Sequence, residues 1–201
     1  MNNFWDSRYD ISGYVYGTKP NRYFMERLKN EEPGRLLLAG EGEGRNAVYA
    51  ATLGWEVYAF DFSMVAKKKA LELAFLRGVS INYQVCPWQD YQVNGHKFDM
   101  AGLFFFHLPP DERMVFHRRI SNWVKPGGKI IAEVFSKKQI ERDSGGPKNP
   151  DMLYSPEILR KDFRTLNIDS VREAYIELDE GRFHQGKAQV VRMEAMVGGN
   201  V

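Results

Sequence analysis

An apolar run that leads into three alternating glycines constrains the fold of this chain more than any other feature. Residues 36–47 read Leu-Leu-Leu-Ala-Gly-Glu-Gly-Glu-Gly-Arg-Asn-Ala. The apolar run predicts a strand, the glycines predict a tight turn, and the residues after Gly44 predict the start of a helix. Because glycine has no Cβ and adopts positive φ at little cost, a ligand can lie close to the backbone of such a turn.

An acidic residue closes the next apolar run. Residues 55–61 predict a second strand that ends in Asp61, 17 residues after Gly44. A carboxylate at the end of this strand is well positioned to bind the hydroxyl groups of a ribose. The glycine turn and Asp61 together predict a site for a nucleoside cofactor.

The spacing of the glycines helps to decide which cofactor. Dinucleotide-binding enzymes use G-x-G-x-x-G, whereas this chain has G-x-G-x-G with acidic Glu41 and Glu43 inside the turn. Their charges would repel a pyrophosphate and suit the ammonium and sulfonium groups of S-adenosylmethionine (SAM). A nicotinamide-dependent oxidoreductase and a non-catalytic SAM-binding module remain the alternatives.

Composition narrows the range of partners. The 201 residues carry a formal net charge of only +2, which indicates no nucleic-acid partner. We interpret Lys67-Lys68-Lys69 as a solvated helix face rather than a phosphate-binding track.

No apolar run has membrane-spanning length, and residues 1–6 do not resemble a signal peptide. The one cysteine, Cys86, excludes an internal disulfide and favours a cytoplasmic location. The four histidines lack metal-ligand spacing, so no metal site is expected.

Strand and helix patterns alternate along most of the chain. We expect strands at 35–39, 55–61, 80–85, 98–106 and 129–135, with helices at 45–53, 63–78 and 111–123 between them. This alternation predicts a parallel sheet with helices on both faces. After a helix that begins near Ser155, residues 170–178 and 187–197 predict an antiparallel pair at one sheet edge. The first 20 residues show no helical pattern and predict a flap or a packed arm, after which Pro20 is expected to open a helix.

Four motifs resemble those of the class I SAM-dependent methyltransferases, in their order and spacing. They are the 40–44 turn, Asp61, the strand start Phe98-Asp99 and the turn at 126–128. Shorter words at 4–5, 16–21, 42–48, 107–110, 145–147 and 180–186 are similar to the small bacterial tellurite-resistance (TehB-like) group. The resemblance implies an α/β, Rossmann-like sheet of order 3-2-1-4-5-7-6 with strand 7 antiparallel. It also implies one domain over 1–201, made of an arm (1–32), a cofactor-binding core (33–136) and an acceptor-side part (137–201).

The resemblance assigns cofactor contacts. Gly40 and Gly42 would lie under the methionine part of SAM, Asp61 would bind the ribose hydroxyls, and Phe62 would pack on the adenine. The expected cofactor-binding set is Gly40, Glu41, Gly42, Glu43, Arg45, Asn46, Asp61, Phe62, Ser63, Trp88, Gln89, Leu103 and Phe104.

The sequence departs from the methyltransferase pattern at two positions. Pro87 stands where the class carries an acid for the adenine amino group, so Gln89 or the Trp88 backbone is the candidate substitute. Leu38 stands where many members carry an acid before the first glycine, and Glu41 or Glu43 is the candidate source of that charge.

Two histidines are the candidates for the reacting centre. Methyl transfer is an in-line displacement, which requires alignment and the exclusion of water, and a base only if the acceptor arrives protonated. His107, just past the fourth strand, either contacts the acceptor or caps the following prolines. His184 matches, by the resemblance, a histidine implicated in the TehB-like active site, the alternative being an exposed turn residue. We expect His96 and His117 at the surface.

The remaining candidates surround the acceptor. Tyr9, Tyr16 and Arg22 are expected to form a lid, although the tyrosines also suit an arm packed on the sheet, and Gln139 is expected to border the acceptor pocket. Residues 108–111 lack the polar and aromatic neighbours that a base-binding Pro-Pro motif needs. We therefore predict a SAM-dependent methyltransferase, monomeric or homodimeric, whose acceptor is a small molecule such as a thiol or another soft nucleophile.

Overall fold

The computed structural model describes residues 2–198 and divides the chain into two compact units. The first, which we call the N unit, comprises the residues up to 92 together with 180–183. The second, the C unit, comprises residues 93–179 and those from 184 onward.

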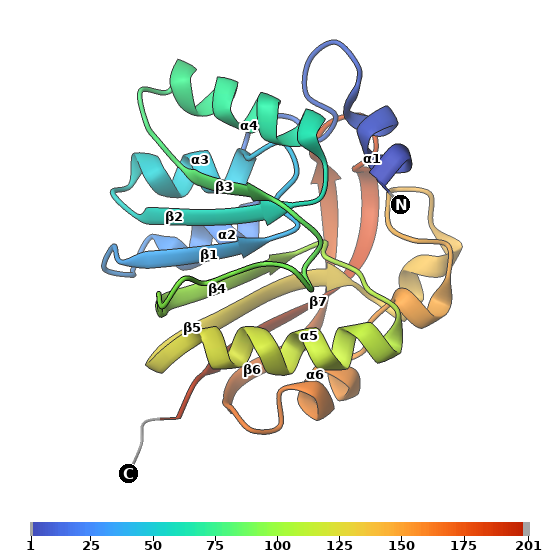
Figure 1. Ribbon diagram of the computed structural model, residues 1–201. Helices are drawn as coiled ribbons and strands as arrows, with labels where there is room; N and C mark the ends of the chain where they lie inside the picture. Colours follow the sequence, from blue (N-terminus) through green and yellow to red (C-terminus); the bar gives the residue numbers. More distant parts are fainter. Residues whose placement is uncertain (1, 199–201) are drawn as a thin grey trace. The chain divides into compact units, whose positions relative to one another are not determined.

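The N unit holds three parallel strands and four helices (Figure 1). Its strands are β1 (Arg35–Ala39), β2 (Glu56–Asp61) and β3 (Asn82–Val85); its helices are α1 (Asn2–Tyr9), α2 (Arg22–Leu28), α3 (Arg45–Thr52) and α4 (Met64–Leu76). Helices α3 and α4 both pack on β2. The Ser63 side chain caps α4 by accepting a hydrogen bond from the Ala66 N–H at 3.0 Å.

The C unit is built on a long hairpin (Figure 1). Its elements are β4 (Phe98–Phe104), α5 (Pro110–Trp123), β5 (Val124–Phe135), the 3₁₀ helices η1 (Lys137–Glu141) and η2 (Pro150–Met152), α6 (Pro156–Asp162), β6 (Asn167–Asp179) and β7 (Gln185–Met196). Strands β4 and β5 are parallel, whereas β7 runs antiparallel to both β5 and β6. A core cluster joins the hairpin to β5 through Phe135, Leu153, Leu178, Ala188 and Val190.

The strand order is β3-β2-β1-β4-β5-β7-β6 in a seven-stranded sheet. The predicted fold class, with its antiparallel seventh strand, is therefore confirmed. None of the described helices combines the length and the apolar character that a membrane crossing requires.

The first segment corrects the expectation that it contains no helix, because residues 2–9 form α1. This helix is stabilised by tertiary packing rather than by a sequence pattern, since Tyr9 joins a buried cluster with Val15 and Ala66 of α4. The next helix is also corrected: Asn21, not Pro20, precedes it and caps it by accepting a hydrogen bond from the Phe24 N–H at 2.9 Å.

Strands β5 and β6 differ most from their expected bounds. Strand β5 begins at Val124 and continues through the Pro-Gly-Gly turn instead of starting at Lys129. A Cβ at Gly128 would lie 2.7 Å from the Asp99 carbonyl oxygen, so glycine is what allows this close approach to β4. Strand β6 begins at Asn167, three residues before the expected start, because its pairing with β7 continues to that point.

Candidate functional site

The glycine turn of the N unit lies close to the Tyr9 side chain and to helix α4. Gly40, Gly42 and Gly44 have φ values of +60°, +59° and +84°. A Cβ at Gly42 would lie 2.7 Å from the Tyr9 hydroxyl oxygen, and one at Gly44 would lie 2.6 Å from the Ala70 Cβ on α4. The second glycine therefore admits the N-terminal arm, and the third admits α4.

Asp61 lies at the end of β2 and is hydrogen-bonded to the glycine turn. Its Oδ2 accepts from the Gly42 N–H at 3.2 Å, and its Oδ1 accepts from the Ser63 N–H at 3.0 Å. Burial raises the pKa of this carboxyl from 3.8 to about 6, although the backbone hydrogen bonds lower it. Each carboxylate oxygen retains a second lone pair that can accept from a ligand hydroxyl.

Glu41 holds the start of α3. Its Oε1 accepts from the Asn46 and Ala47 N–H groups at 2.9 and 2.7 Å, which satisfies two donors at the helix N-terminus. Burial raises its pKa from 4.5 to about 7, against the lowering effect of these bonds and of the Arg45 charge.

Glu43 binds the N-terminal arm to the turn. Its buried carboxylate accepts from the Val15 N–H at 2.7 Å and from the Tyr16 N–H at 3.3 Å. The Lys69 ammonium of α4 pairs with the same carboxylate at 3.0 Å and also donates to the Ile11 and Gly13 carbonyls. The Glu43 carboxylate therefore interacts with groups of the protein itself.

Arg45, the first residue of α3, carries a group without a partner. Its Nη2 forms an ion pair of 2.8 Å with the Glu180 carboxylate in the turn between β6 and β7. Its Nη1 is buried and has no hydrogen-bond partner among the residues that the structure describes. An unsatisfied buried guanidinium N–H is costly, which makes Nη1 a candidate donor to an anionic ligand. The neighbouring Asn46 accepts from the Asn21 N–H at 2.8 Å.

The other N-unit residues that were predicted to bind the cofactor or to form the lid differ in how close they lie to the glycine turn. Tyr9 is buried against Gly42, and the Tyr16 hydroxyl accepts from Arg8 at 3.2 Å. Arg22 is exposed on α2, where it pairs with Glu26. Ser63 is buried as the α4 cap, Phe62 is half-buried, Trp88 is buried and Gln89 is exposed.

Sequence reasoning missed two residues that hold the turn. The Tyr83 hydroxyl on β3 donates to the Gly42 carbonyl at 2.7 Å, and Lys69 pairs with Glu43. Neither has a motif of its own, because both reach the turn from strands or helices that only tertiary packing brings near it.

The C unit brings the two candidate histidines onto one aromatic ring. The His107 ring stacks on Phe135 with centroids 5.7 Å apart, and His184 meets the edge of the same ring at 5.4 Å. His184 also lies 4.6 Å from Phe105, whose φ of +53° is unusual for a bulky residue. We call Phe105, His107, Phe135 and His184 the histidine cluster. Leu103 and Phe104 are buried at the end of β4, directly before it.

His107 uses both ring nitrogens inside the protein. Its Nδ1 lies 2.8 Å from the Met152 carbonyl oxygen, and its Nε2 lies 3.4 Å from the Phe135 N–H. The Nε2 position therefore accepts and Nδ1 carries the proton. Burial lowers the pKa of His107 from 6.5 to about 4, so the ring is neutral at physiological pH.

Gln139 organises the loop beside the histidine cluster. Its buried side chain donates to the Ser144 hydroxyl and the Gly145 carbonyl and accepts from the Gln189 N–H at 2.8 Å. Gly146, the residue after Gly145, lies so close to Phe135 that a Cβ at this position would be 2.8 Å from the ring. Gln139 thus fixes a loop that borders the cluster.

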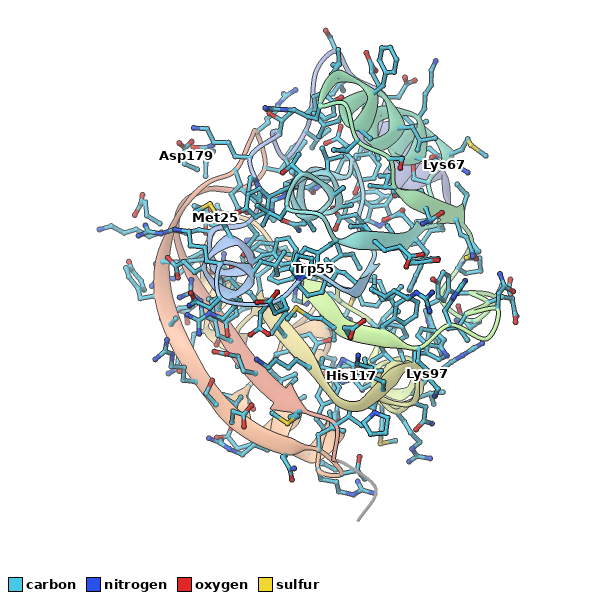
Figure 2. The ribbon with its side chains drawn as sticks, turned by 90° about the vertical axis from the view of Figure 1, so that its left-hand side faces the viewer. Met25, Trp55, Lys67, Lys97, His117 and Asp179 are labelled. Carbon is cyan, nitrogen blue, oxygen red and sulfur yellow. The ribbon has the colours of Figure 1, made fainter. Side chains whose placement is uncertain are left out.

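His117, which Figure 2 labels, corrects the expectation of a surface residue. Only 1% of it is exposed. Its ring stacks on Phe163 at 4.5 Å, and its Nδ1 lies 3.0 Å from the Asp162 carboxylate, which also pairs with Arg113 at 2.9 Å. The packing of α5 on α6 creates this burial. Burial acts to raise the Asp162 pKa, but its two partners lower it overall. No group of residues in the described part of the chain could hold a metal ion.

Comparison with known proteins finds a family that is similar to the core of the chain. Residues 36–128 match the family described as methyltransferase domain. Over these residues the chain is similar to a methyltransferase domain. The match to a methyltransferase domain, together with a structural neighbour solved with bound SAH, favours SAM over the nicotinamide cofactor. No curated protein sequence matches the chain significantly.

Solved structures share the fold at low sequence identity. A structure from a study of the conversion of a disulfide bond into a thioacetal group during echinomycin biosynthesis has a TM-score of 0.80 and 18% identity, covering 100% of this chain and 94% of that one. TehB from Haemophilus influenzae has a TM-score of 0.72 and 15% identity, covering 98% and 66%. The magnesium protoporphyrin IX methyltransferase of Synechocystis PCC 6803, solved with bound SAH, has a TM-score of 0.64 and 16% identity, covering 88% and 79%.

Proposed function

We propose that this methyltransferase transfers a methyl group from SAM to a small acceptor with a soft nucleophile, such as a thiol. The observation that best supports SAM as the methyl donor is the buried Asp61 carboxylate at the end of β2, which accepts a hydrogen bond from the Gly42 N–H. This arrangement suits ribose hydroxyls because its free lone pairs accept from neutral donors.

The charges around the glycine turn support SAM as the ligand. The buried Arg45 Nη1 lacks a partner and suits the carboxylate of the methionine part. The open φ values of Gly40 and Gly42 suit a ligand that passes close to the backbone. We propose Phe62 as the adenine-packing residue, with Trp88 and Gln89 near the adenine edge. Tyr9, which lies over Gly42, is the proposed lid residue.

The histidine cluster supports the acceptor half of the proposal. His184 packs against the rings of Phe105 and Phe135, and such aromatic surroundings suit a polarisable, weakly hydrated nucleophile. The echinomycin-related structure comes from a study of sulfur chemistry. The likeness to TehB supports a place for this chain in the tellurite-resistance (TehB-like) group. We therefore propose a sulfur or similar soft atom as the methyl acceptor.

The two histidines receive different roles. When bound, SAM supplies a methyl group on a positively charged sulfur. Transfer of that methyl to a thiol releases one proton, and we propose that His184 accepts it, since a neutral imidazole is a suitable base near neutral pH. His107 has both nitrogens occupied, which supports a positioning role: it holds the Met152 carbonyl and packs against Phe135.

A methyl-transfer assay tests this proposal. Purified protein is supplied with methyl-labelled SAM and separate panels of small thiols, amines and phenols. We expect methylated thiols as products, and we expect His184→Asn to lower kcat by about 10²- to 10⁴-fold, as the loss of a general base does. His96→Asn, in the loop before β4, is the matched control and should leave kcat unchanged.

Two results would contradict parts of the proposal. Methylated amines or phenols without methylated thiols would overturn the soft acceptor and leave the cofactor assignment standing. Binding of SAM without turnover on any panel would favour the non-catalytic SAM-binding module instead.

We also propose that the protein works in the cytoplasm. Its one cysteine, Cys86, is a free thiol, which fits a reducing compartment. Fractionation of the native cells with an antibody to the protein would test the location, and recovery in a membrane or secreted fraction would contradict it.

A further inference from the structure

Helix α1 places a second carboxylate beside the cofactor site. Figure 1 shows α1 at the end of α4 where that helix begins. At this point the Ser63 hydroxyl donates a hydrogen bond to Oδ1 of Asp6, which is half-buried on α1. The N–H of the same serine donates to Oδ1 of Asp61 at 3.0 Å. Ser63 therefore binds both the carboxylate of the arm and the carboxylate proposed to bind the ribose.

The two carboxylates have no positive charge to balance them. Neither Asp6 nor Asp61 forms an ion pair with any residue that the structure describes. The basic side chains of the region have other partners, namely Lys69 with Glu43, Arg45 with Glu180, and Arg8 with the Tyr16 hydroxyl and the rings of Phe4, Trp5 and Phe183. Asp61 is only 7% exposed, and a buried carboxylate without a counter-charge is unfavourable. A positively charged ligand would relieve that cost.

The Tyr9 hydroxyl points to the same place. Tyr9 follows Asp6 by three residues, so the two side chains lie on one side of α1. Only 4% of Tyr9 is exposed, and a Cβ at Gly42, whose N–H binds Asp61, would lie 2.7 Å from its hydroxyl oxygen. This hydroxyl forms no hydrogen bond with the residues that the structure describes. Both groups of α1 can therefore interact with a ligand bound at the glycine turn.

We propose that Asp6 is a further residue of the cofactor site, where its charge favours the cationic SAM over the uncharged product S-adenosylhomocysteine. The inference rests on the proposed function, because it assumes that SAM binds beside Asp61. The sulfur of SAM carries a positive charge, which is lost when the methyl group leaves. Opposite charges a few ångströms apart attract strongly where water is largely excluded. The Asp6 carboxylate would thus hold the methyl donor and let the product dissociate more readily.

Isothermal titration with SAM and with S-adenosylhomocysteine measures this preference as the ratio of the product dissociation constant to the SAM dissociation constant. Asp6→Asn keeps the shape of the side chain and can still accept from Ser63, but it removes the charge. At about pH 7.5, where Asp61 is ionised, we expect this variant to weaken SAM binding by about tenfold and product binding by less than about twofold. Asp10→Asn, exposed just after α1, is the matched control and should leave both constants unchanged.

Two further variants separate the charge of Asp6 from its packing. Asp6→Glu keeps the charge and should keep most of the wild-type ratio, whereas Asp6→Ala should lower the ratio as Asp6→Asn does. Circular dichroism and thermal unfolding identify any variant that fails to fold. Equal weakening of both ligands by the two neutral variants, or no weakening of either, would overturn the role of Asp6. Folded wild type that binds neither ligand would instead overturn the proposed function, and this inference with it.

Discussion

The glycine turn and the histidine cluster are assembled in different ways. The turn combines residues 40–44 with Asp61, which end neighbouring parallel strands. The cluster combines Phe105, Phe135 and His184, which come from three distant parts of the chain. A cofactor site is therefore encoded in one short β-turn-α-β stretch, whereas the surroundings of the acceptor depend on how the later strands pair.

Burial also acts on the two regions with opposite sign. It raises the pKa of Glu41 and Asp61 around the glycine turn and lowers the pKa of His107 in the cluster. Each region therefore favours the neutral form of its groups, which are acids in one and a base in the other. A positively charged ligand beside the acids would shift them back toward their ionised form, whereas an uncharged acceptor fits beside the neutral histidine.

Removal of Asp162 should have the largest effect on stability. This carboxylate pairs with both Arg113 and His117 inside the C unit. Asp162→Ala leaves a buried guanidinium unpaired, so we expect the free energy of unfolding to fall by about 3–5 kcal/mol. Urea unfolding measures it, with the exposed Asp169→Ala as the control. A loss equal to that of the control would show that the contacts of Asp162 with Arg113 and His117 do not stabilise the C unit.

The third glycine should be nearly as sensitive. A Cβ at Gly44 would lie 2.6 Å from the Ala70 Cβ, and φ is +84°. Gly44→Ala therefore combines backbone strain with overpacking, for an expected loss of about 2–4 kcal/mol. Gly78→Ala has a similar φ of +67° but open space, and should lose only about 1–2 kcal/mol. Equal losses for the two variants would mean that α4 packing does not constrain the turn.

Glu43 should matter more to the arm than to the fold. Glu43→Gln removes the ion pair with Lys69 and weakens the bonds to the Val15 and Tyr16 N–H groups. We expect a loss of about 1–2 kcal/mol and faster proteolytic cleavage before residue 20. Glu31→Gln serves as the control. Unchanged cleavage would mean that Glu43 does not hold the N-terminal arm on the glycine turn, and would remove the basis for Tyr9 as a lid residue.

The pH dependence of stability should distinguish the two regions most finely. The folded pKa of Asp61 is raised, so its contribution to stability is present below pH 3.8 and is lost as the pH rises through about 6. The folded pKa of His107 is lowered, so its contribution is present above pH 6.5 and is lost as the pH falls through about 4.

Paired variants isolate the two titrations. Asp61→Asn should make stability rise more steeply with pH between about 4 and 6, and His107→Gln should make it rise less steeply over about 4 to 6.5. Urea unfolding across that range measures both slopes. Slopes that change in the same direction would contradict the opposite electrostatics of the two regions.

The sequence predicted the features that depend on residues close to one another in the chain. The strand at 35–39, the glycine turn, the helix after Gly44 and the Ser63 cap follow from neighbouring residues, and the structure contains all four. The seven-strand order followed from the family resemblance rather than from any pattern in the residues, and it is also confirmed.

The missed features depend on partners that are distant in the sequence. Helix α1 is stabilised by contacts of Tyr9 with α4, and His117 is buried by Asp162, 45 residues away. Arg45 was predicted to bind the cofactor, but its ion pair with Glu180 has no sequence signal, because those residues are 135 positions apart. Such contacts form only when the chain is folded.

Isothermal titration with SAM tests the central claim most directly. We expect the wild type to bind SAM and S-adenosylhomocysteine but not NADH, with affinity rising as the pH increases through about 6 and Asp61 ionises. Asp61→Asn should weaken SAM binding severely, while Asp169→Asn should bind like the wild type. Folded wild type that does not bind SAM, or Asp61→Asn that binds as tightly as the wild type, would contradict the assignment of the cofactor site to the glycine turn.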